Sequence, residues 1–281
     1  MMRVLVTGSA GLVGSAIARR LRAAGRTVVG VDRLPSAETS VVADLRDSAA
    51  WRGALDGVGA VVHTAALHAP HVGVRPDAEF HEVNVGATRE LLAAATAAGV
   101  RRFVYTGSTS VYGHALEPVD GAVWITEEVA PRPRDVYDET KLAAERLVLD
   151  AGAEGGLSTV CLRIARCFPE PPEVEARHRL YRGVALADVA EAHLLAVEGD
   201  AEGVLNVAGP YPWLEEDLKR LRYDPAGLIT GRLPEVAAGF ARRGWALPTS
   251  VDRVYVSARA GAVLGYRPRH GVSELTSPGV K

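Results

Sequence analysis

The sequence contains little cysteine and little lysine. Its 281 residues include two cysteines, Cys161 and Cys167. Without partners at ligand spacing, two cysteines are too few for a disulfide framework or a thiolate metal site. We therefore expect two reduced thiols and no metal. The most closely spaced histidines, His63, His68 and His71, have a pattern more typical of loop and pocket lining than of metal ligands.

The sequence also lacks a strong charge imbalance and a long apolar run. Its net charge is -2, and no basic or acidic block favours nucleic acid as a partner. No apolar run reaches the length of a membrane span. The first residues, Met1–Thr7, lead directly into a strand-like run and lack the charged and apolar regions of a signal peptide. We expect a cytoplasmic protein that binds neither nucleic acid nor membranes.

Short apolar runs alternate with helical patterns through the first two thirds of the chain. We predict strands at Arg3–Thr7, Thr27–Asp32, Val41–Ala43, Ala60–His63, Phe103–Thr106 and Thr159–Ile164. We predict helices at Leu12–Ala24, Ala78–Ala98 and Val136–Leu149. This alternation is typical of an α/β fold with a Rossmann-type, doubly wound parallel sheet covered by helices on both faces. Such sheets bind ligands at the carboxyl ends of their strands.

The pattern changes after Arg163. A proline-rich loop is followed by further predicted helices and one strand (Val204–Val207), the helices being Ala187–Val197, Glu215–Leu221, Glu235–Arg243 and Ser257–Leu264. We interpret residues 1–165 as the Rossmann domain and residues 166–281 as a small C-terminal lobe interwoven with the sheet. The tail, Val272–Lys281, is rich in turn-type residues, and we expect it to be disordered.

A glycine-rich turn links the first predicted strand to the first helix. Gly8, Gly11 and Gly14 have the spacing at which a dinucleotide-binding turn needs residues without a Cβ. Free N–H groups at the helix start, around Leu12 and Val13, would meet a pyrophosphate at the positive end of the helix dipole. A glycine triplet alone is a weak signal, but this one has the required strand before it and helix after it. We predict that residues 1–165 bind NAD(P) here.

Asp32 ends the second predicted strand. A carboxylate at this position accepts hydrogen bonds from the adenosine ribose, although Asp32 could also be an ordinary turn aspartate. Its charge would repel a 2′-phosphate, whereas the neighbouring Arg33 could receive one. We expect NAD as the cofactor, with NADP as the alternative.

The candidate catalytic residues are a tyrosine, a lysine and a serine. Tyr137 and Lys141 lie four residues apart at the start of a predicted helix and share one face of it. A lysine ammonium and an oxidised nicotinamide would both lower the phenol pKa from ~10, as a base requires, and the lysine could also hold the nicotinamide ribose. Ser108 follows the fifth strand, where its hydroxyl can hydrogen-bond a substrate oxygen. Thr109 and Ser110 either contact substrate or cap a loop.

Taken together, these motifs resemble the extended short-chain dehydrogenase/reductases, the family of nucleotide-sugar epimerases and dehydratases. The residues that carry the resemblance span nearly the full length: Thr7–Gly14, Asp32, Asp44, Leu45, His63–Ala66, Asn84, Phe103–Gly113, Tyr137–Lys141, Ala187–Ala190 and Leu264–Pro268. The resemblance implies catalytic roles for Ser108, Tyr137 and Lys141, and we expect a homodimer.

The resemblance also implies cofactor contacts outside the glycine turn. Asp44 and Leu45 would flank the adenine, and Ala65 and Ala66 would pass close to the cofactor. Asn84 would be either a buried residue on the cofactor side or a structural residue.

Two departures from the family pattern bear on the substrate. Thr109 and Ser110 stand where sugar dehydratases have an Asp-Glu pair, which argues against a dehydratase. The segment between Arg163 and Asp188 is shorter than the stretch that grips the nucleotide diphosphate in full-length epimerases. The run Cys167–Pro171 resembles the uronate dehydrogenases, but their Asn-His pair after the catalytic serine is absent.

An enzyme with these groups would move a hydride at a secondary hydroxyl or ketone of a sugar or sugar-derived metabolite. A nucleotide-sugar epimerase, a sugar-acid dehydrogenase and a ketoreductase on a free or amino sugar all use one set of groups, so the residues leave the three open. The alternative of another class is a cofactor-sensing binding protein without activity. Retention of both the tyrosine and the lysine favours the enzyme.

Arginines cluster in the segment that should border the substrate, and one more follows in the lobe: Arg166, Arg177, Arg179, Arg182 and Arg253. Most could simply pair with the glutamates among them, Glu170, Glu173 and Glu175. A guanidinium is also suited to bidentate binding of carboxylate or phosphate. We therefore expect one or two, above all Arg166 or Arg177, to point into the pocket and bind an acidic group of the substrate.

Overall fold

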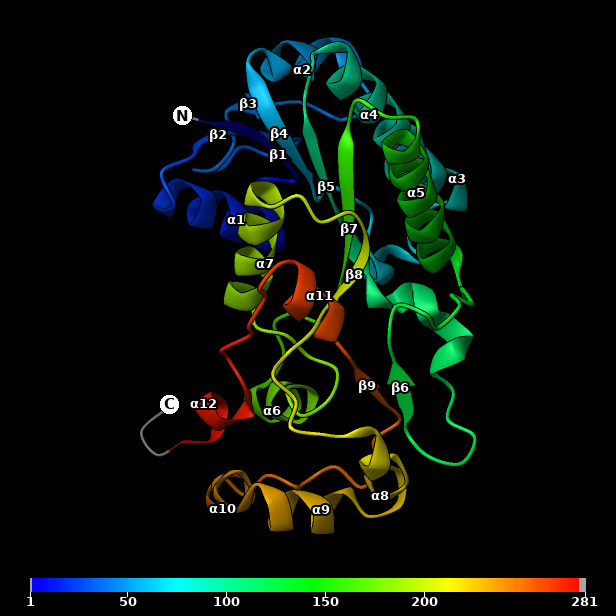
Figure 1. The fold of residues 1–281 in the computed structure, drawn as a ribbon, viewed down its shortest axis with the longest axis vertical. Coiled ribbons are helices and arrows are strands. Elements are labelled where there is room, and N and C mark those ends of the chain that lie inside the picture. Colours follow the sequence, from blue (N-terminus) through cyan, green and yellow to red (C-terminus); the bar gives the residue numbers. More distant parts are fainter. Residues whose placement is uncertain (1, 278–281) are drawn as a thin grey trace.

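The structure, a computed structural model, describes residues 2–277 and is built around one parallel sheet (Figure 1). Seven strands lie in the order β3-β2-β1-β4-β5-β7-β8, and every neighbouring pair is parallel. They are β1 Arg3–Thr7, β2 Thr27–Asp32, β3 Val41–Val42, β4 Val58–His63, β5 Arg102–Ser108, β7 Ser158–Ile164 and β8 Gly203–Val207. The strand order reverses between β1 and β4, so the predicted Rossmann-type, doubly wound sheet is confirmed.

Helices cover both faces of this sheet (Figure 1). On one face lie α1 (Leu12–Ala23) and α7 (Leu186–Glu198), and on the other α4 (Ala87–Ala97) and α5 (Val136–Ala153). Along β1, Val6 packs into the core beneath α1 and α7, whereas Leu5 packs into the core beneath α4 and α5. Strands with both faces covered are apolar throughout rather than alternating, and the central strands have this composition.

The lobe lies below the sheet in Figure 1. Its helices are α6 Pro172–His178, α8 Leu218–Tyr223, α9 Pro225–Arg232, α10 Pro234–Arg242, α11 Ala258–Val263 and α12 Val272–Thr276. A third core, with Phe240 and Trp213 among its buried residues, holds these helices together except α11, whose Ala260 packs into the core beneath α1 and α7. Beyond residue 165 the chain forms α6 in the lobe and then returns to the sheet with α7 and β8. The division of the chain at residue 165 stays a prediction.

A two-stranded parallel ladder ties the lobe to the first part of the chain. Strand β6 (Val123–Ile125) pairs with β9 (Arg253–Tyr255), with Trp124 opposite Val254. The sequence analysis missed both strands, and it also missed α2 (Ser48–Trp51), α6 and α9.

Two expected elements differ from the prediction. The helix expected at Ala78–Ala98 consists of α3 (Asp77–Phe80), a π-helical segment (His81–Gly86) and α4. The expectation of a disordered tail is wrong for residues 272–276, because Val272 is buried in the third core and holds α12 against α6 and α10. Residues 278–281 of that tail lie outside the described residues.

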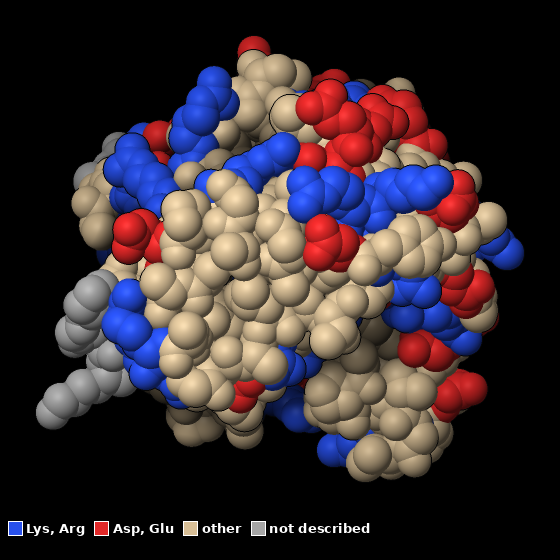
Figure 2. Space-filling view, turned by 90° about the horizontal axis from the view of Figure 1, so that it is seen from below, with Lys and Arg blue, Asp and Glu red and all other residues tan. Residues whose placement is uncertain are grey.

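Figure 2 shows the lobe end of the molecule, where basic and acidic side chains are interspersed around a largely uncharged centre. Charge of one sign therefore does not dominate this face. Within residues 2–277, no helix has both the length and the apolar character needed to cross a membrane.

Candidate active site

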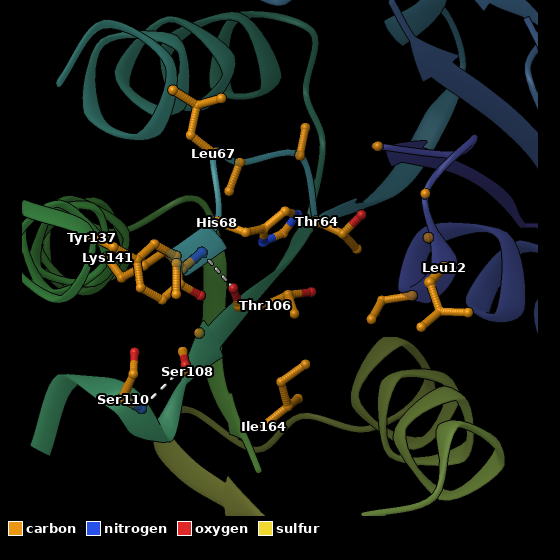
Figure 3. A pocket seen from close by; sticks show the side chains of 18 of the residues that line it. Leu12, Thr64, Leu67, His68, Thr106, Ser108, Ser110, Tyr137, Lys141 and Ile164 are labelled. Carbon is orange, nitrogen blue, oxygen red and sulfur yellow. Dashed lines mark hydrogen bonds between the residues drawn. The ribbon is translucent and has the colours of Figure 1, made fainter. Parts of the chain in front are cut away.

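A cavity of about 660 Å³ lies at the carboxyl ends of the central strands, where the sheet meets the lobe (Figure 3). Its volume is within the range of small-molecule sites, and it includes the point where the strand order reverses. The glycine turn after β1, the loop after β4 and the end of β5 form its walls. Residues of the lobe, including Arg182 and Tyr255, close the far side.

The glycine turn leaves space that side chains would fill. Gly8 has φ +70°, and a Cβ there would lie 2.6 Å from Thr64 Oγ1. A Cβ on Gly14 would lie 2.1 Å from the Gly8 carbonyl oxygen. Gly11 caps α1 without a side-chain hydrogen bond, so the first N–H groups of this twelve-residue helix are left for a ligand. These features fit the pyrophosphate of a dinucleotide.

Asp32 fixes the turn as well as bordering the cavity. Its two carboxylate oxygens accept hydrogen bonds from the backbone N–H groups of Ala10 (2.9 Å) and Leu34 (2.9 Å). Carboxylate oxygens have further lone pairs, so the ribose role remains open to it. Arg33 also lines the cavity. The carboxylate that would favour NAD and the guanidinium that could accept the 2′-phosphate of NADP therefore both border the cofactor site.

Most of the other expected cofactor residues line the same cavity. These are Leu12, Val13, Asp44, Leu45, Ala65 and Ala66. Arg46 pairs with Asp44 at 2.7 Å and its guanidinium lowers the pKa of that carboxyl.

Asn84 does not line the cavity. It is buried, its Oδ1 accepts from the Leu67 N–H (2.7 Å), and its Nδ2 donates to Thr140 Oγ1 (3.1 Å) and to the Leu67 carbonyl (3.2 Å). Asn84 thus joins the loop after β4 to α5. Asn84 is therefore buried, as expected, and its role toward the cofactor stays a prediction.

Helix α5 presents Tyr137 and Lys141 to the cavity. Asp135 caps the helix by accepting from the Asp138 N–H (2.9 Å), which places Tyr137 in its first turn. Lys141 donates from Nζ to the Thr106 carbonyl (2.8 Å), and its Nζ lies 4.2 Å from the centre of the Tyr105 ring. In Figure 3 both side chains extend from α5 toward the end of β5.

The electrostatics of this pair differ from our expectation. Burial raises the pKa of Tyr137 to about 12, partly offset by a hydrogen bond from Ser108. Burial also lowers the pKa of Lys141 to about 7, although Glu145 raises it. Removal from water therefore dominates the phenol pKa in the protein alone, and Ser108, not Lys141, provides the partial offset. A low phenol pKa would require an additional positive charge in the cavity.

Ser108 ends β5 and lines the cavity beside Tyr137. Its Oγ accepts from the Ser110 N–H at 3.1 Å, which fixes its side chain at the start of the following turn. Thr109 and Ser110 also line the cavity, and Ser110 Oγ is buried without a hydrogen-bond partner in the described chain.

The arginines separate into two groups. Arg166 lines the cavity and pairs with Glu170 (2.6 Å). Arg177 does not line it: this residue pairs with Glu173, and its Nε donates to the Ala246 carbonyl (3.0 Å). The expectation that Arg177 points into the pocket is therefore wrong, because the segment forms helix α6 and turns this side chain toward the outside of the lobe.

Other residues at the cavity were not assigned from the sequence. Arg182 and Arg253 were named only as members of the arginine cluster, and both line the cavity together with Arg134. Among the lining residues that the described part of the lobe contributes, none is Asp or Glu. His68 and His71 also line the cavity, in agreement with the loop and pocket lining that their spacing indicated, although neither was given a role.

Comparison with known proteins agrees with this geometry. A family model described as the NAD dependent epimerase/dehydratase family matches residues 4–185. A 3 beta-hydroxysteroid dehydrogenase/Delta 5-->4-isomerase of Mycobacterium tuberculosis is 37% identical over 173 residues, which are 57% of this chain and 46% of that protein. A UDP-glucose 4-epimerase of Streptomyces lividans is 32% identical over 227 residues, 75% of this chain and 64% of that one. The chain thus spans about half to two thirds of the length of these relatives.

Solved structures of short-chain dehydrogenase/reductases and related proteins resemble this fold over nearly the whole chain. A short-chain dehydrogenase/reductase superfamily protein of Agrobacterium tumefaciens with bound NAD has a TM-score of 0.74 and 26% identity, covering 98% of this chain and 94% of that one. MoeE5 in complex with UDP-glucuronic acid and NAD has a TM-score of 0.71 and 30% identity, covering 97% and 95%. The chain belongs to the NAD dependent epimerase/dehydratase family of enzymes, within the extended short-chain dehydrogenase/reductases that its motifs resemble.

Proposed function

We propose that this protein transfers a hydride between NAD and a secondary hydroxyl or ketone of a sugar or sugar-derived metabolite, as a nucleotide-sugar epimerase does. One observation carries the proposal. Ser108, Tyr137 and Lys141 line the same cavity as the glycine turn, so a substrate oxygen and a dinucleotide can share it.

The residues that would hold NAD lie at the end of the cavity formed by the glycine turn, which we call the cofactor end. Gly8, Gly11 and the N–H groups that begin α1 would meet the pyrophosphate, and Asp32 the adenosine ribose. Leu12, Val13, Gly14, Asp44, Leu45, Ala65 and Ala66 complete this wall. When bound, NAD supplies the group that accepts a hydride from the substrate carbon or returns it.

The chain's own residues would handle the proton. Tyr137 takes it from the substrate hydroxyl, or gives it to the ketone oxygen, while Ser108 hydrogen-bonds that oxygen. Because Tyr137 is protonated at neutral pH in the protein alone, the tyrosine is ready to donate toward a ketone. Acting as base, it depends on positive charge near its hydroxyl, which the Lys141 ammonium supplies in part.

The alternative is a dehydrogenase or ketoreductase on a free sugar or sugar acid. The cationic wall of the lobe supports this alternative, with Arg166 as the proposed contact to an acidic group and Thr109 as a neighbouring polar contact. The sequence relatives include a hydroxysteroid dehydrogenase and UDP-glucose epimerases. Six arginines line the cavity, and the four that we do not assign to the cofactor, Arg134, Arg166, Arg182 and Arg253, favour a polar substrate over a steroid. The homodimer and the cytoplasmic location remain predictions from the sequence.

The test combines turnover with cofactor binding. We expect Tyr137→Phe to lower turnover at least about a thousandfold, because the mutant loses the proton-transferring hydroxyl. The dissociation constant for NAD, measured by calorimetry, should stay within about threefold of wild type. Tyr223→Phe is the matched control, since Tyr223 is exposed and lies outside the cavity. Normal turnover in Tyr137→Phe would refute the proposed mechanism.

A second measurement separates the two candidate reactions. An epimerase returns the hydride before the product leaves. NAD is therefore regenerated in each turnover and does not need to be exchanged. NAD retained through purification, detected after denaturation, would favour the epimerase. Free exchange of NAD, with reduced cofactor accumulating in proportion to substrate, would favour the dehydrogenase.

A further inference from the structure

His68 extends into the cavity from the loop that follows β4. In Figure 3 its ring extends into the cavity between the loop and the end of β5, on the side of Thr64 and above Thr106. The centres of the His68 and Tyr137 rings are 6.5 Å apart. The hydrogen bonds of His68 are made by its backbone: its N–H donates to His71 Nδ1 (2.9 Å), and its carbonyl accepts from the His71 N–H (2.8 Å).

The ring of His68 differs from the histidine rings packed elsewhere in the fold. His63 is bonded at both nitrogens, to Thr7 Oγ1 (2.7 Å) and Thr88 Oγ1 (2.8 Å). His193 is likewise bonded at both, to Thr106 Oγ1 and the Val189 carbonyl. Within residues 2–277, neither ring nitrogen of His68 has a hydrogen-bond partner, and the side chain is open to the cavity. Its nitrogens are therefore available to a ligand.

The ring also has a defined chemical character. Partial removal from water and the nearby Lys141 charge lower the pKa of His68. A neutral imidazole has one donor and one acceptor nitrogen, so it can bind either a hydroxyl or a carbonyl oxygen.

We propose that His68 holds a second polar group of the substrate, on the carbon next to the one whose oxygen meets Tyr137. This inference rests on the proposed function, since it places the reacting oxygen at Tyr137. Each hydrogen bond spans roughly 2.7–3.0 Å. Because the two rings are neighbours at one cavity, two oxygens that engage them can lie on adjacent carbons of one substrate. The substrate class is a vicinal diol or an α-hydroxy ketone, rather than an isolated secondary alcohol.

A matched pair of probes tests the selectivity. Cyclohexane-1,2-diol and cyclohexanol differ only in the second hydroxyl. We expect the NAD-loaded wild type to prefer the diol about tenfold in kcat/KM, the effect of one hydrogen bond. His68→Phe should remove this preference mainly through KM, and His68→Gln, which keeps a donor and an acceptor, should restore part of it. His114→Phe is the control, because His114 is exposed and outside the cavity.

A binding measurement avoids dependence on turnover. In protein labelled at histidine with ¹³C, the signal missing from His68→Phe belongs to His68. Cyclohexane-1,2-diol should shift that signal in the NAD-loaded protein, and cyclohexanol at equal concentration should not. No shift with the diol, or equal use of both alcohols, overturns the inference while leaving the role of Tyr137 intact. A loss of NAD affinity in His68→Phe also overturns it, since His68 would then serve the cofactor. Loss of Tyr137-dependent turnover on every alcohol would instead count against the proposed function.

Discussion

The two ends of the cavity differ in what lines them: backbone atoms at the cofactor end and long side chains at the lobe end. At the cofactor end, Gly8, Gly11 and Gly14 shape the wall with backbone atoms, and their contacts lie within a few residues of one another or on the adjacent strand. At the lobe end, long side chains such as Arg182 and Arg253 form the wall, and these two residues are far apart in the chain. The first end has almost no freedom to vary in shape, whereas the second can change its lining without disturbing the sheet. This difference explains how one sheet can serve relatives named for steroids and for sugar nucleotides.

The largest expected effect, a loss of both stability and NAD binding, follows from adding one methyl group at the cofactor end, and the comparison is one methyl group added in the lobe. In Gly14→Ala the new Cβ would lie 2.1 Å from the Gly8 carbonyl oxygen, a backbone atom that cannot move aside. We expect a loss of about 3 kcal/mol or more in unfolding free energy, and loss of measurable NAD binding. Gly231→Ala in helix α9 of the lobe meets nothing within 4 Å and should stabilise the protein by up to about 1 kcal/mol. Equal tolerance of the two changes in urea unfolding would contradict the comparison.

The cofactor end could be predicted from the sequence better than the lobe end, because its residues are close together in the chain. The glycine turn, Asp32 and the Tyr137–Lys141 spacing are local patterns, so the sequence alone indicated them. The β6–β9 ladder joins residues 123–125 to 253–255, and the short runs involved carry no local sign of that pairing. Helix α6 begins in a proline-rich stretch that looked irregular, so the direction of Arg177 could not be deduced.

The high pKa of Tyr137 was unpredictable for a related reason. Burial is a property of the assembled fold, whereas the sequence shows only that Lys141 is one turn away. The sequence therefore indicated the nearby charge but not the extent to which the phenol is removed from water.

A second test concerns charges between the two ends. Glu145 and Arg163 form a buried, bidentate pair behind Lys141, with Nε–Oε2 at 2.9 Å and Nη2–Oε1 at 2.6 Å. Glu145→Gln leaves the guanidinium without its counter-charge, and we expect a loss of about 3–5 kcal/mol in unfolding free energy. The exposed pair of Arg26 and Glu198 is the control, where Glu198→Gln should cost less than about 1 kcal/mol.

The same variant tests the electrostatics of Lys141. Because Glu145 raises the pKa of Lys141, that pKa should fall below its wild-type value of about 7 in Glu145→Gln. The lysine is then neutral over more of the pH range below 7, and its ammonium contribution at Tyr137 is lost as pH rises through the lowered pKa. The chain has few lysines, so ¹³C NMR of labelled lysine can follow this titration. An unchanged or raised pKa would show that Glu145 does not act on Lys141.

A third, smaller effect is expected at the adenosine end. Asp32→Asn keeps an oxygen for the N–H groups of Ala10 and Leu34 but removes the charge that would bind a ribose and repel a 2′-phosphate. We expect the ratio of NAD to NADP affinity to fall about 10–100-fold, as for the loss of hydrogen bonds to a charged group. Arg33→Gln is the counterpart and should raise that ratio. Wild-type preference for NADP in calorimetry would show that Arg33 decides the cofactor.

The smallest expected effect is that of replacing Arg177. Compared with a replacement of Arg166, it tests whether only the arginines that line the cavity contribute to substrate binding. Arg177 pairs with Glu173 at the outside of the lobe, so Arg177→Gln should cost less than about 1 kcal/mol in stability and leave kcat/KM unchanged. Arg166 lies on the same stretch of chain but lines the cavity. If it binds an acidic group, Arg166→Gln should raise KM about tenfold for D-glucuronate and leave KM for uncharged D-glucose unchanged. Added salt should reduce the difference, because Arg166 is partly exposed. If Arg177→Gln, and not Arg166→Gln, raised KM for D-glucuronate, the outer face of the lobe would take part in substrate binding. The assignment of Arg177 to the outside of the substrate site would then be wrong.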